Sequence, residues 1–315
     1  MNTKKIILDT DIGTDVDDVW ALGLLLKSPE LDLKLVTTVN GDTIYRSKIV
    51  AKFLQRANRC DIPIGIGCAD DNKLNRQWQW VENYDIEQYP GKIYYDGVQA
   101  MIDMVMSSSK PVTIISIGPL TNIAEAVKRC PEITQNAEII GMHGSIKSGK
   151  NAIPGKVAEY NVLQDVESAK LVFKQDWNIT ITPLDTCGIV KFRGEKYSLL
   201  KNSDSSLVKD IIENYRIWDI NAKIGNFEVE SSILFDTVAI YLGFTDEYLN
   251  MERIKLVIDG SGFMNETDNG KDINVAISWN DLEGYEDFLI ERYLSNPKGK
   301  TKIDSVETQN VLVSE

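Results

Sequence analysis

The feature that most constrains the fold of this 315-residue chain is a regular alternation of short apolar runs with longer segments of helical pattern. Several apolar runs are unbroken stretches of Ile, Val and Leu, which is typical of strands buried on both faces of a sheet. This order of strands and helices predicts an α/β fold with a mostly parallel, Rossmann-like open sheet and helices on both faces. The expected strands are 4–9, 31–42, 62–67, 110–118, 137–144 and 178–185, and the expected helices are 17–28, 44–57, 97–109, 120–131 and 166–176.

The organisation of the chain favours one domain. No repeat or low-complexity linker interrupts the pattern, so the sequence predicts a single domain over residues 1–315. The stretches 66–96 and 143–157 are expected to form long loops, and long loops in compact domains often carry function. The polar tail after about residue 296 is expected to be loosely held.

Charge and composition limit the classes of molecule that the protein is expected to bind. The net charge is −13 and the pI is about 4.7. Nucleic acid and anionic membranes are therefore not expected as partners, because affinity for phosphate comes mainly from Lys and Arg. The four cysteines form no CxxC pair, and neither a signal-peptide pattern nor an apolar run of membrane-spanning length is present. These features predict a cytoplasmic protein.

The segment LDTDIGTDVDDV, residues 8–19, places five aspartates directly after the first expected strand. In parallel α/β sheets, ligands bind beyond the carboxyl ends of the strands. Carboxylates that converge there repel one another unless a cation neutralises them. Oxygen donors without a nearby His or Cys suit a hard cation, and a flexible site of many carboxylates favours Ca²⁺ over Mg²⁺. The five residues are Asp9, Asp11, Asp15, Asp17 and Asp18, and other expected strand ends carry Asn40, Asp42 and Asp185.

The residues alone leave two other interpretations of this segment open. The aspartates could be loop and helix N-cap residues, since Asp favours both places, although one helix needs fewer than five. Asp9 and Asp11 also have the spacing of Mg²⁺-dependent phosphatases of the haloacid dehalogenase type, in which the first Asp is a nucleophile. The additional pair Asp17-Asp18 is not expected in that type, and its downstream Lys and paired Asp are not evident here.

Four segments, in order along the chain, resemble the inosine-uridine preferring nucleoside hydrolase family. The first resembles the family motif Asp-Thr-Asp-Pro-Gly-x-Asp-Asp, with Ile12 in place of the proline and two additional residues before Asp17. The others resemble its Gly-Pro-Leu-Thr-Asn segment, its Ala-Glu-Phe-Asn segment and the segment with its last metal-binding aspartate. The four segments are DTDIGTDVDD (9–18), SIGPLTNIAEAV (116–127), VAEYNVLQDVESAKLVF (157–173) and LFDTVAIYL (234–242).

The resemblance implies Ca²⁺-dependent hydrolysis of the N-glycosidic bond of ribonucleosides to free base and ribose. It implies that one Ca²⁺ is held by Asp11, Asp18, Asp236 and the backbone carbonyl of Thr121. Asp11 would also take the proton from the attacking water, and Asp9 would support the site from behind. The residues implied to bind the ribose are Asp17, Glu159 and Asn161, together with Asn40 and Asp42 at the end of the second strand; Asp42 stands where the family usually has Asn. Asp15 receives no role from the resemblance.

The chain departs from the family on the side of the base. Many members have a His immediately before the last metal-binding aspartate, where it protonates the leaving base, and this chain has Phe235 there. Some purine-specific members carry an aromatic residue at this position and stack the base between rings, so Phe235 favours purine nucleosides. The candidate stacking partners are Trp78, Trp80, Tyr84 and Trp218. The single histidine, His143, is either a structural group or a residue that faces the site.

A lysine-rich stretch replaces the Gly-Asn that the family has before its Ala-Glu-Phe-Asn segment. Lys147, Lys150 and Lys156 are either ordinary surface residues or a contact for an anionic group of the substrate. A relative that hydrolyses another ribosyl compound, or only binds it, is therefore the alternative function. The family often forms homodimers or homotetramers, and the same is expected here.

Overall fold

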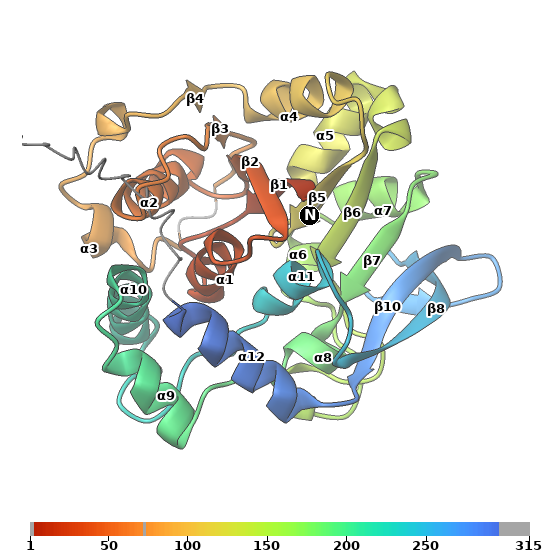
Figure 1. Cartoon of the computed structure of the whole chain (residues 1–315). Coiled ribbons are helices and arrows are strands. Elements are labelled where there is room, and N and C mark those ends of the chain that lie inside the picture. The colour runs from red at the N-terminus through yellow and green to blue at the C-terminus, as the bar shows by residue number, and fades with distance from the viewer. Residues whose placement is uncertain (1–2, 72–73, 296–315) are drawn as a thin grey trace, which may run out of the picture.

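One ten-stranded sheet organises the computed structural model, which describes residues 3–71 and 74–295 (Figure 1). The expected loose tail after about residue 296 lies outside the described residues. The strand order across the sheet is β4-β3-β2-β1-β5-β6-β7-β10-β8-β9. The strands are β1 (Lys4–Thr10), β2 (Leu31–Thr38), β3 (Ile64–Ile66), β4 (Ile93–Tyr94), β5 (Val112–Ser116), β6 (Ala137–Met142), β7 (Ile179–Thr182), β8 (Leu249–Ile258), β9 (Met264–Glu266) and β10 (Lys271–Trp279).

The central strand β1 shows why the apolar runs are unbroken. It pairs in parallel with β2 on one side and β5 on the other. Ile6 and Leu8 belong to the apolar core on one face of the sheet, and Ile7 belongs to the core on the other face. All three side chains are fully buried. The prediction of a mostly parallel α/β fold in a single domain is therefore confirmed.

Helices cover both faces of the sheet, as expected from the sequence (Figure 1). Residues of α1, α2, α10, α11 and α12 belong to the core that contains Ile6, and residues of α4, α5 and α7 belong to the core that contains Ile7. The helices are α1 (Asp17–Leu26), α2 (Thr43–Arg56), α3 (Trp78–Val81), α4 (Gly97–Met106), α5 (Thr121–Arg129), α6 (Tyr160–Gln164), α7 (Val166–Lys174), α8 (Leu184–Cys187), α9 (Gly194–Lys201), α10 (Ser206–Ala222), α11 (Thr237–Leu242) and α12 (Leu282–Leu294). None of these described helices is long and apolar enough to cross a membrane.

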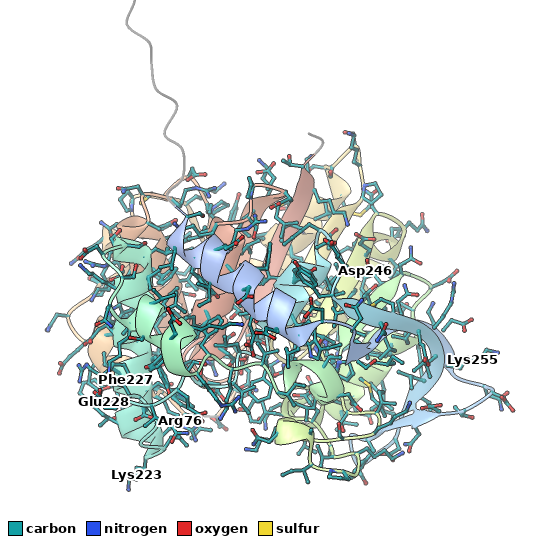
Figure 2. All side chains as sticks on the ribbon, turned by 60° about the horizontal axis from the view of Figure 1, so that its bottom comes forward. Arg76, Lys223, Phe227, Glu228, Asp246 and Lys255 are labelled. Atoms are coloured by element: carbon teal, nitrogen blue, oxygen red, sulfur yellow. The ribbon has the colours of Figure 1, made fainter. Side chains whose placement is uncertain are left out.

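Two parts of the fold were not predicted. The expected loop 66–96 contains the short helix α3, a 3₁₀ turn at Ile86–Gln88 and the edge strand β4. Beyond β7, the sheet continues with β10, and β8 and β9 add to it in antiparallel pairs. Side chains of β8 are mostly exposed or half-buried, so its sequence lacks the continuous apolar run of a central strand. Figure 2 shows Lys255 on this antiparallel arm, at the opposite edge of the molecule from Arg76.

Candidate active site

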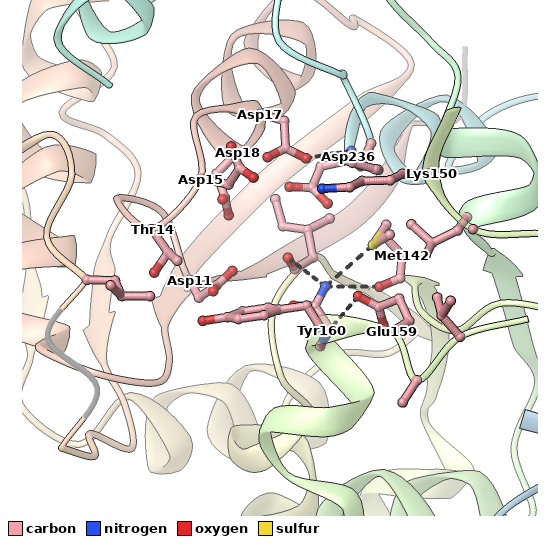
Figure 3. Close-up of a pocket in the computed structure, with 18 of the residues that line it drawn as sticks. Asp11, Thr14, Asp15, Asp17, Asp18, Met142, Lys150, Glu159, Tyr160 and Asp236 are labelled. Carbon is pink, nitrogen blue, oxygen red and sulfur yellow. Dashed lines mark hydrogen bonds between the residues drawn. The ribbon is translucent and has the colours of Figure 1, made fainter. Parts of the chain in front are cut away.

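A cavity of about 560 Å³ opens at the carboxyl edge of the parallel strands (Figure 3). Four buried aspartates of its lining, called here the acidic floor, are Asp11, Asp17, Asp18 and Asp236. Its solvent-exposed part, called here the rim, consists of Leu74, Lys150, Ile153, Val157 and Tyr160. The remaining lining residues are Thr14, Asp15, Arg76, Ile117, Met142, Gly149, Ala158, Glu159, Asn161, Leu184 and Phe235. A volume of this size suits a small organic ligand.

The acidic floor joins segments that are far apart in the chain. Asp17 and Asp18 open α1, and Asp236 immediately precedes α11. The backbone N–H of Asp236 donates a hydrogen bond to Oδ2 of Asp17 over 3.2 Å. One carboxylate oxygen from each of the three residues lies within 4.8 Å of the other two. Two helix N-termini therefore direct their partial positive charge at one group of carboxylates.

The electrostatics of the floor favour a cation. Burial is the main cause that raises the pKa of Asp17, Asp18 and Asp236 well above the ordinary value, and repulsion between neighbouring carboxylates raises the pKa further. A divalent cation would remove both penalties, because it neutralises the carboxylates that the protein has withdrawn from water. The donor set is oxygen only among the described residues of the floor, which fits Ca²⁺ or Mg²⁺.

Asp11 lies in the cavity beside these residues and is tied to a buried arginine. Burial raises the pKa of Asp11 to about 6, although the positive charge of Arg46 opposes this rise. The guanidinium of Arg46 is 1% exposed and donates to the backbone oxygens of Asp11 and Ile12 and to Oγ1 of Thr14. The last two distances are 2.9 and 2.8 Å. Arg46 thus holds the whole β1–α1 loop.

Sequence reasoning missed Arg46. It lies on α2, where an arginine of an amphipathic helix is ordinarily taken as a surface residue. Its Nε also donates to the backbone oxygen of Asn40, a residue with the left-handed φ of 64°. An arginine four residues after the Asp42 helix cap was the only signal available, and it does not reveal burial.

Asp9 lies behind the floor, where the resemblance implies a supporting role. Its side chain is fully buried and does not line the cavity. It accepts hydrogen bonds from Oγ1 of Thr37 at 2.5 Å and from Nδ2 of Asn122 at 2.8 Å. Burial raises the pKa of Asp9 to about 7. A phosphatase nucleophile must reach its substrate, so the position of Asp9 argues against the phosphatase interpretation.

Glu159 and Asn161 also line the cavity, and hydrogen bonds hold both side chains in place. Oε1 of Glu159 accepts from the backbone N–H of Asn161 at 2.8 Å, and Oε2 accepts from Gly144 at 3.0 Å and Val162 at 3.2 Å. Burial nevertheless raises the pKa of Glu159 to about 7. Nδ2 of Asn161 donates to the backbone oxygen of Met142 at 3.1 Å, which leaves its amide oxygen for another partner.

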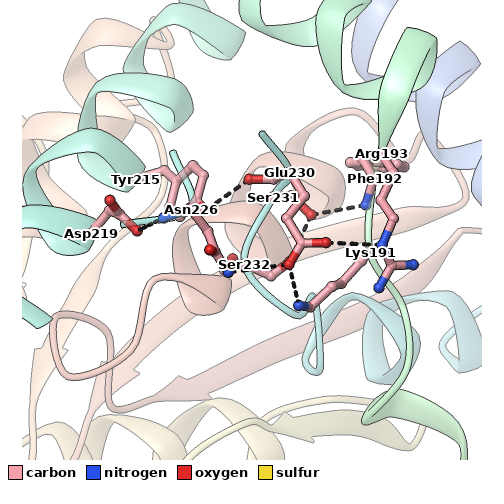
Figure 4. Close-up of polar contacts among 9 residues, drawn as sticks. All are labelled: Lys191, Phe192, Arg193, Tyr215, Asp219, Asn226, Glu230, Ser231 and Ser232. Atoms are coloured by element: carbon pink, nitrogen blue, oxygen red, sulfur yellow. Dashed lines mark hydrogen bonds and ion pairs between the residues drawn. The ribbon is translucent and has the colours of Figure 1, made fainter. Parts of the chain in front are cut away.

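The segment that delivers Phe235 and Asp236 is braced by a polar network (Figure 4). Glu230 forms ion pairs with Lys191 at 2.6 Å and Arg193 at 2.9 Å. The backbone N–H of Ser231 donates to the backbone oxygen of Phe192 at 2.9 Å, and the Tyr215 hydroxyl donates to the backbone oxygen of Glu230 at 2.8 Å. These contacts fix the approach to α11, so Phe235 and Asp236 are presented to the cavity by a well-anchored chain.

Five of the residues expected in the site do not line the cavity. Thr121 opens α5 and its hydroxyl donates to Asp165 at 2.7 Å. Asn40 donates from Nδ2 to Asp70 at 2.8 Å, and Asp42 is an exposed cap of α2 that accepts from the backbone N–H of Tyr45. Trp78 is 45% exposed on α3. Trp218 is buried, and its indole N–H donates to the backbone oxygen of Thr14 at 3.2 Å, so it supports the β1–α1 loop from outside the cavity.

Among the residues that the structure describes, the aromatic side chains at the cavity are Phe235 and Tyr160. Of the other two stacking candidates, Trp80 packs against Phe53 in the core and the Tyr84 hydroxyl donates to Gln55. Neither lines the cavity. Tyr160 was not singled out from the sequence, although it lies between Glu159 and Asn161 and its position in that segment was an available signal.

His143 does not face the cavity. Its ring is fully buried, and Nε2 lies 3.2 Å from the backbone oxygen of Gly118. Burial lowers the pKa of His143 to about 4, so the ring is neutral near neutral pH. The structure thus places the single histidine in a structural position, which was one of the two alternatives left open by the sequence.

Comparison with known proteins identifies relatives of the chain. A nucleoside hydrolase of Leishmania major, described as inosine-uridine preferring, is 36% identical over 200 residues, which is 58% of this chain and 60% of that protein. The chain thus spans less than two thirds of that relative. The enzyme of the same description from Crithidia fasciculata is 29% identical over 82% of this chain and 84% of its own length.

Solved structures share the fold. A plant nucleoside hydrolase superposes with a TM-score of 0.79 at 23% identity, covering 94% of this chain and all of that one. A purine-preferring ribonucleoside hydrolase from Gardnerella vaginalis has a TM-score of 0.76 at 21% identity, covering 92% of this chain and 98% of that one. The family model described as inosine-uridine preferring nucleoside hydrolase matches residues 6–286. This match runs from β1 into α12 and includes the acidic floor, and the chain therefore belongs to the inosine-uridine preferring nucleoside hydrolase family.

Proposed function

We propose that the protein hydrolyses the N-glycosidic bond of ribonucleosides, with Ca²⁺ at the acidic floor and a modest preference for purine nucleosides. The observation that carries this proposal is the convergence of buried carboxylates from α1 and α11 in a cavity of nucleoside size. Several ionised carboxylates suit a ribose that becomes positively charged as the glycosidic bond breaks. Membership of the family supports the reaction class, and the convergence of the carboxylates supports the choice of residues.

Ca²⁺ would be held by the carboxylates of Asp11, Asp18 and Asp236, all of which line the cavity. When bound, this ion polarises a water molecule and offers coordination sites to the ribose hydroxyls. Asp17 belongs to the same group of carboxylates in the structure, with one oxygen within 4.8 Å of those of Asp18 and Asp236. We assign Asp17 to the ribose 2′-hydroxyl, which would contact both this carboxylate and the bound Ca²⁺.

Each of the protein's own residues at the cavity has a separate role in the proposed reaction. A carboxylate oxygen of Asp11, which lines the cavity, takes the proton from the attacking water. Glu159 and the free amide oxygen of Asn161 hold further ribose hydroxyls. The apolar walls formed by Ile117, Met142 and Leu184 exclude bulk water around the sugar.

The preference for purines is supported by the character of the base side. Phe235 and Tyr160 are the aromatic side chains that line the described cavity, and Ile153 and Val157 add apolar side chains to the lining. A flat apolar surface favours the larger ring system, because stacking and apolar burial grow with ring area.

A substrate panel with a metal-depletion control tests the proposed function. Inosine, guanosine, adenosine, uridine and cytidine are incubated with the protein, with and without EDTA, and free ribose is measured. We expect ribose release from the purine nucleosides, its loss in EDTA and its return on addition of Ca²⁺. Absence of ribose from all five substrates would refute the proposed hydrolysis, and binding of a ribose-like inhibitor without turnover would then favour a ribosyl-binding relative.

The assembly state is a separate expectation. We propose a homodimer or homotetramer, on the strength of family membership alone. Light scattering coupled to size-exclusion chromatography measures the mass of the particle directly, and a mass of 35.4 kDa would show a monomer instead.

A further inference from the structure

Among the described residues, no histidine lines the cavity to donate a proton to the base. When a C1′–N bond breaks, the electron pair of the bond stays with the base nitrogen, which then needs a proton or a neighbouring positive charge. His143 is buried away from the cavity, and Phe235 carries no transferable proton. Within residues 3–71 and 74–295, the cationic side chains that line the cavity are Arg76 and Lys150.

Most proton-bearing groups of the cavity are committed elsewhere. Both oxygens of Glu159 accept backbone N–H hydrogen bonds. The carboxylates of Asp17, Asp18 and Asp236 lie together at the proposed metal site. Arg76 has a guanidinium, which does not give up a proton under ordinary conditions. Oδ1 of Asp15, which also lines the cavity, accepts the backbone N–H of Val16 at 2.8 Å. Lys150 is therefore the candidate donor, and the hydroxyl of Tyr160 is an alternative that a variant can test.

Lys150 is presented by an anchored hairpin, residues 147–156. Asp185 holds the start of this hairpin in place. The carboxylate of Asp185 accepts the backbone N–H groups of Ile146, Lys147 and Ser148 at 2.8, 2.7 and 3.0 Å. The backbone N–H of Gly149 donates to the oxygen of Ile153 across the hairpin at 2.9 Å. Side-chain carboxylates that accept several backbone donors hold a loop in one conformation.

The tip of the hairpin adopts an unusual backbone conformation. Asn151 and Ala152 both have left-handed φ values, of 58° and 54°. Two consecutive non-glycine residues in this region cost free energy that the surrounding contacts must offset. The backbone N–H of Asn151 donates to the oxygen of Gly188 at 2.8 Å, which pins the tip to the loop after α8. The result is that Lys150, directly before this pair, points across the cavity toward Asp236 (Figure 3).

The three lysines of this stretch have different surroundings. Lys156 donates to the side chain of Asn265 and is turned toward β9. Lys147 is exposed and does not line the cavity. Lys150 lines the cavity, and its charge acts on Asp15 there. Among the described residues, its ammonium group makes no hydrogen bond or ion pair. An unpaired ammonium at the rim is available to a ligand.

We propose that Lys150 is the general acid that protonates the departing base, an inference that rests on the proposed nucleoside hydrolysis. The water oxygen bonds to C1′, and Asp11 takes the proton that this water loses. The C1′–N bond breaks, its electron pair moves to the base nitrogen, and that nitrogen takes a proton from the Lys150 ammonium. The neutral Lys150 amine recovers a proton from Asp11 through solvent, so ribose and neutral base are the only products.

Two substrates of different leaving ability test this role. Inosine releases a basic nitrogen that needs a proton, whereas 4-nitrophenyl β-D-riboside releases a stable phenolate that does not. Lys150→Met should lower kcat for inosine by roughly 100-fold or more, the usual contribution of a general acid, and should leave the aryl riboside nearly unaffected. Lys150→Arg keeps the charge but holds its proton, so it should not restore inosine hydrolysis.

Matched variants separate the other outcomes. Lys147→Met, on the same hairpin but outside the cavity, should behave as the unaltered protein toward both substrates. Equal loss on both substrates in Lys150→Met, or full recovery in Lys150→Arg, would overturn the proposal while leaving the hydrolase activity established. Selective loss of inosine cleavage in Tyr160→Phe, with Lys150→Met unaffected, would assign the proton to Tyr160. If the unaltered protein cleaves neither substrate, the proposed function itself fails.

Discussion

The acidic floor and the rim of the same cavity are built in opposite ways. The floor takes its side chains from the starts of α1 and α11 and from the β1–α1 loop, and all four are buried. The rim takes its side chains from the hairpin and loops around 74 and 147–160, and they are exposed. Rigid elements thus position the charged residues proposed to bind metal and ribose. Apart from Phe235, which directly precedes Asp236, the residues proposed to meet the base lie at the rim. Such a division lets base preference change without disturbing the floor.

The largest effect is expected from removing one carboxylate of the floor. Asp18→Ala should abolish Ca²⁺ binding and hydrolysis together, because Asp18 shares its buried site with Asp17 and Asp236. Calorimetric titration with Ca²⁺ measures the binding independently of turnover. Asp268→Ala removes an exposed aspartate of the β9–β10 turn and serves as the control. Unaltered Ca²⁺ affinity in Asp18→Ala would show that the floor is not the metal site.

The second effect concerns the arginine that holds the floor in place. Arg46→Met should lower the free energy of unfolding by about 3 kcal/mol, because it leaves the backbone oxygens of Ile12 and Asn40 buried without the guanidinium that they bind. Urea unfolding measures this loss, with Arg216→Met on the exposed face of α10 as a control. A loss no larger than that of the control would mean that the loop is held by other contacts.

The third effect is a dependence of stability on pH. Burial raises the pKa of Asp9 and Glu159 to about 7 and that of Asp11 to about 6. These groups bind protons more tightly in the folded protein than in the unfolded chain. The native state therefore holds more protons between about pH 4 and pH 7, and its stability falls as the pH rises through this range.

Thermal unfolding in EDTA at about pH 5 and about pH 8 measures this difference. We expect the metal-free protein to unfold at a lower temperature at the higher pH. Ca²⁺ should reduce the difference, because the cation neutralises the carboxylates that protons neutralise at low pH. Equal or higher stability of the metal-free protein at about pH 8 would contradict the burial of uncompensated carboxylates.

The smallest effect is expected from a substitution of Phe235, which lines the cavity directly before Asp236 in the chain. Phe235→His adds a ring that can donate a proton beside Asp236, so it should increase kcat for uridine several-fold. It should change inosine hydrolysis less, because Lys150 already serves that leaving group in the proposed mechanism. Steady-state kinetics on both nucleosides provide the comparison. An unchanged or lower kcat for uridine would indicate that leaving-group protonation does not limit pyrimidine turnover.

Much of this architecture follows from local sequence patterns. Unbroken apolar runs identify strands such as β1 and β5, and the order of strands and helices indicates a parallel sheet. The aspartates after β1 are placed at the carboxyl edge by the same rule. By contrast, β8 and β10 escaped prediction because their exposed faces break the apolar pattern.

What the sequence by itself determined is the fold class, the family and the presence of an acidic site; the tertiary structure decided which side chains meet there. Asp17 and Asp236 are 219 positions apart and come together only because α1 and α11 lie side by side on one face of the sheet. Burial of Arg46 and His143, and the exposure of Trp78, depend equally on packing between distant elements. Periodicity reports the environment along one element, whereas the direction of a side chain in a cavity depends on all the elements that surround it.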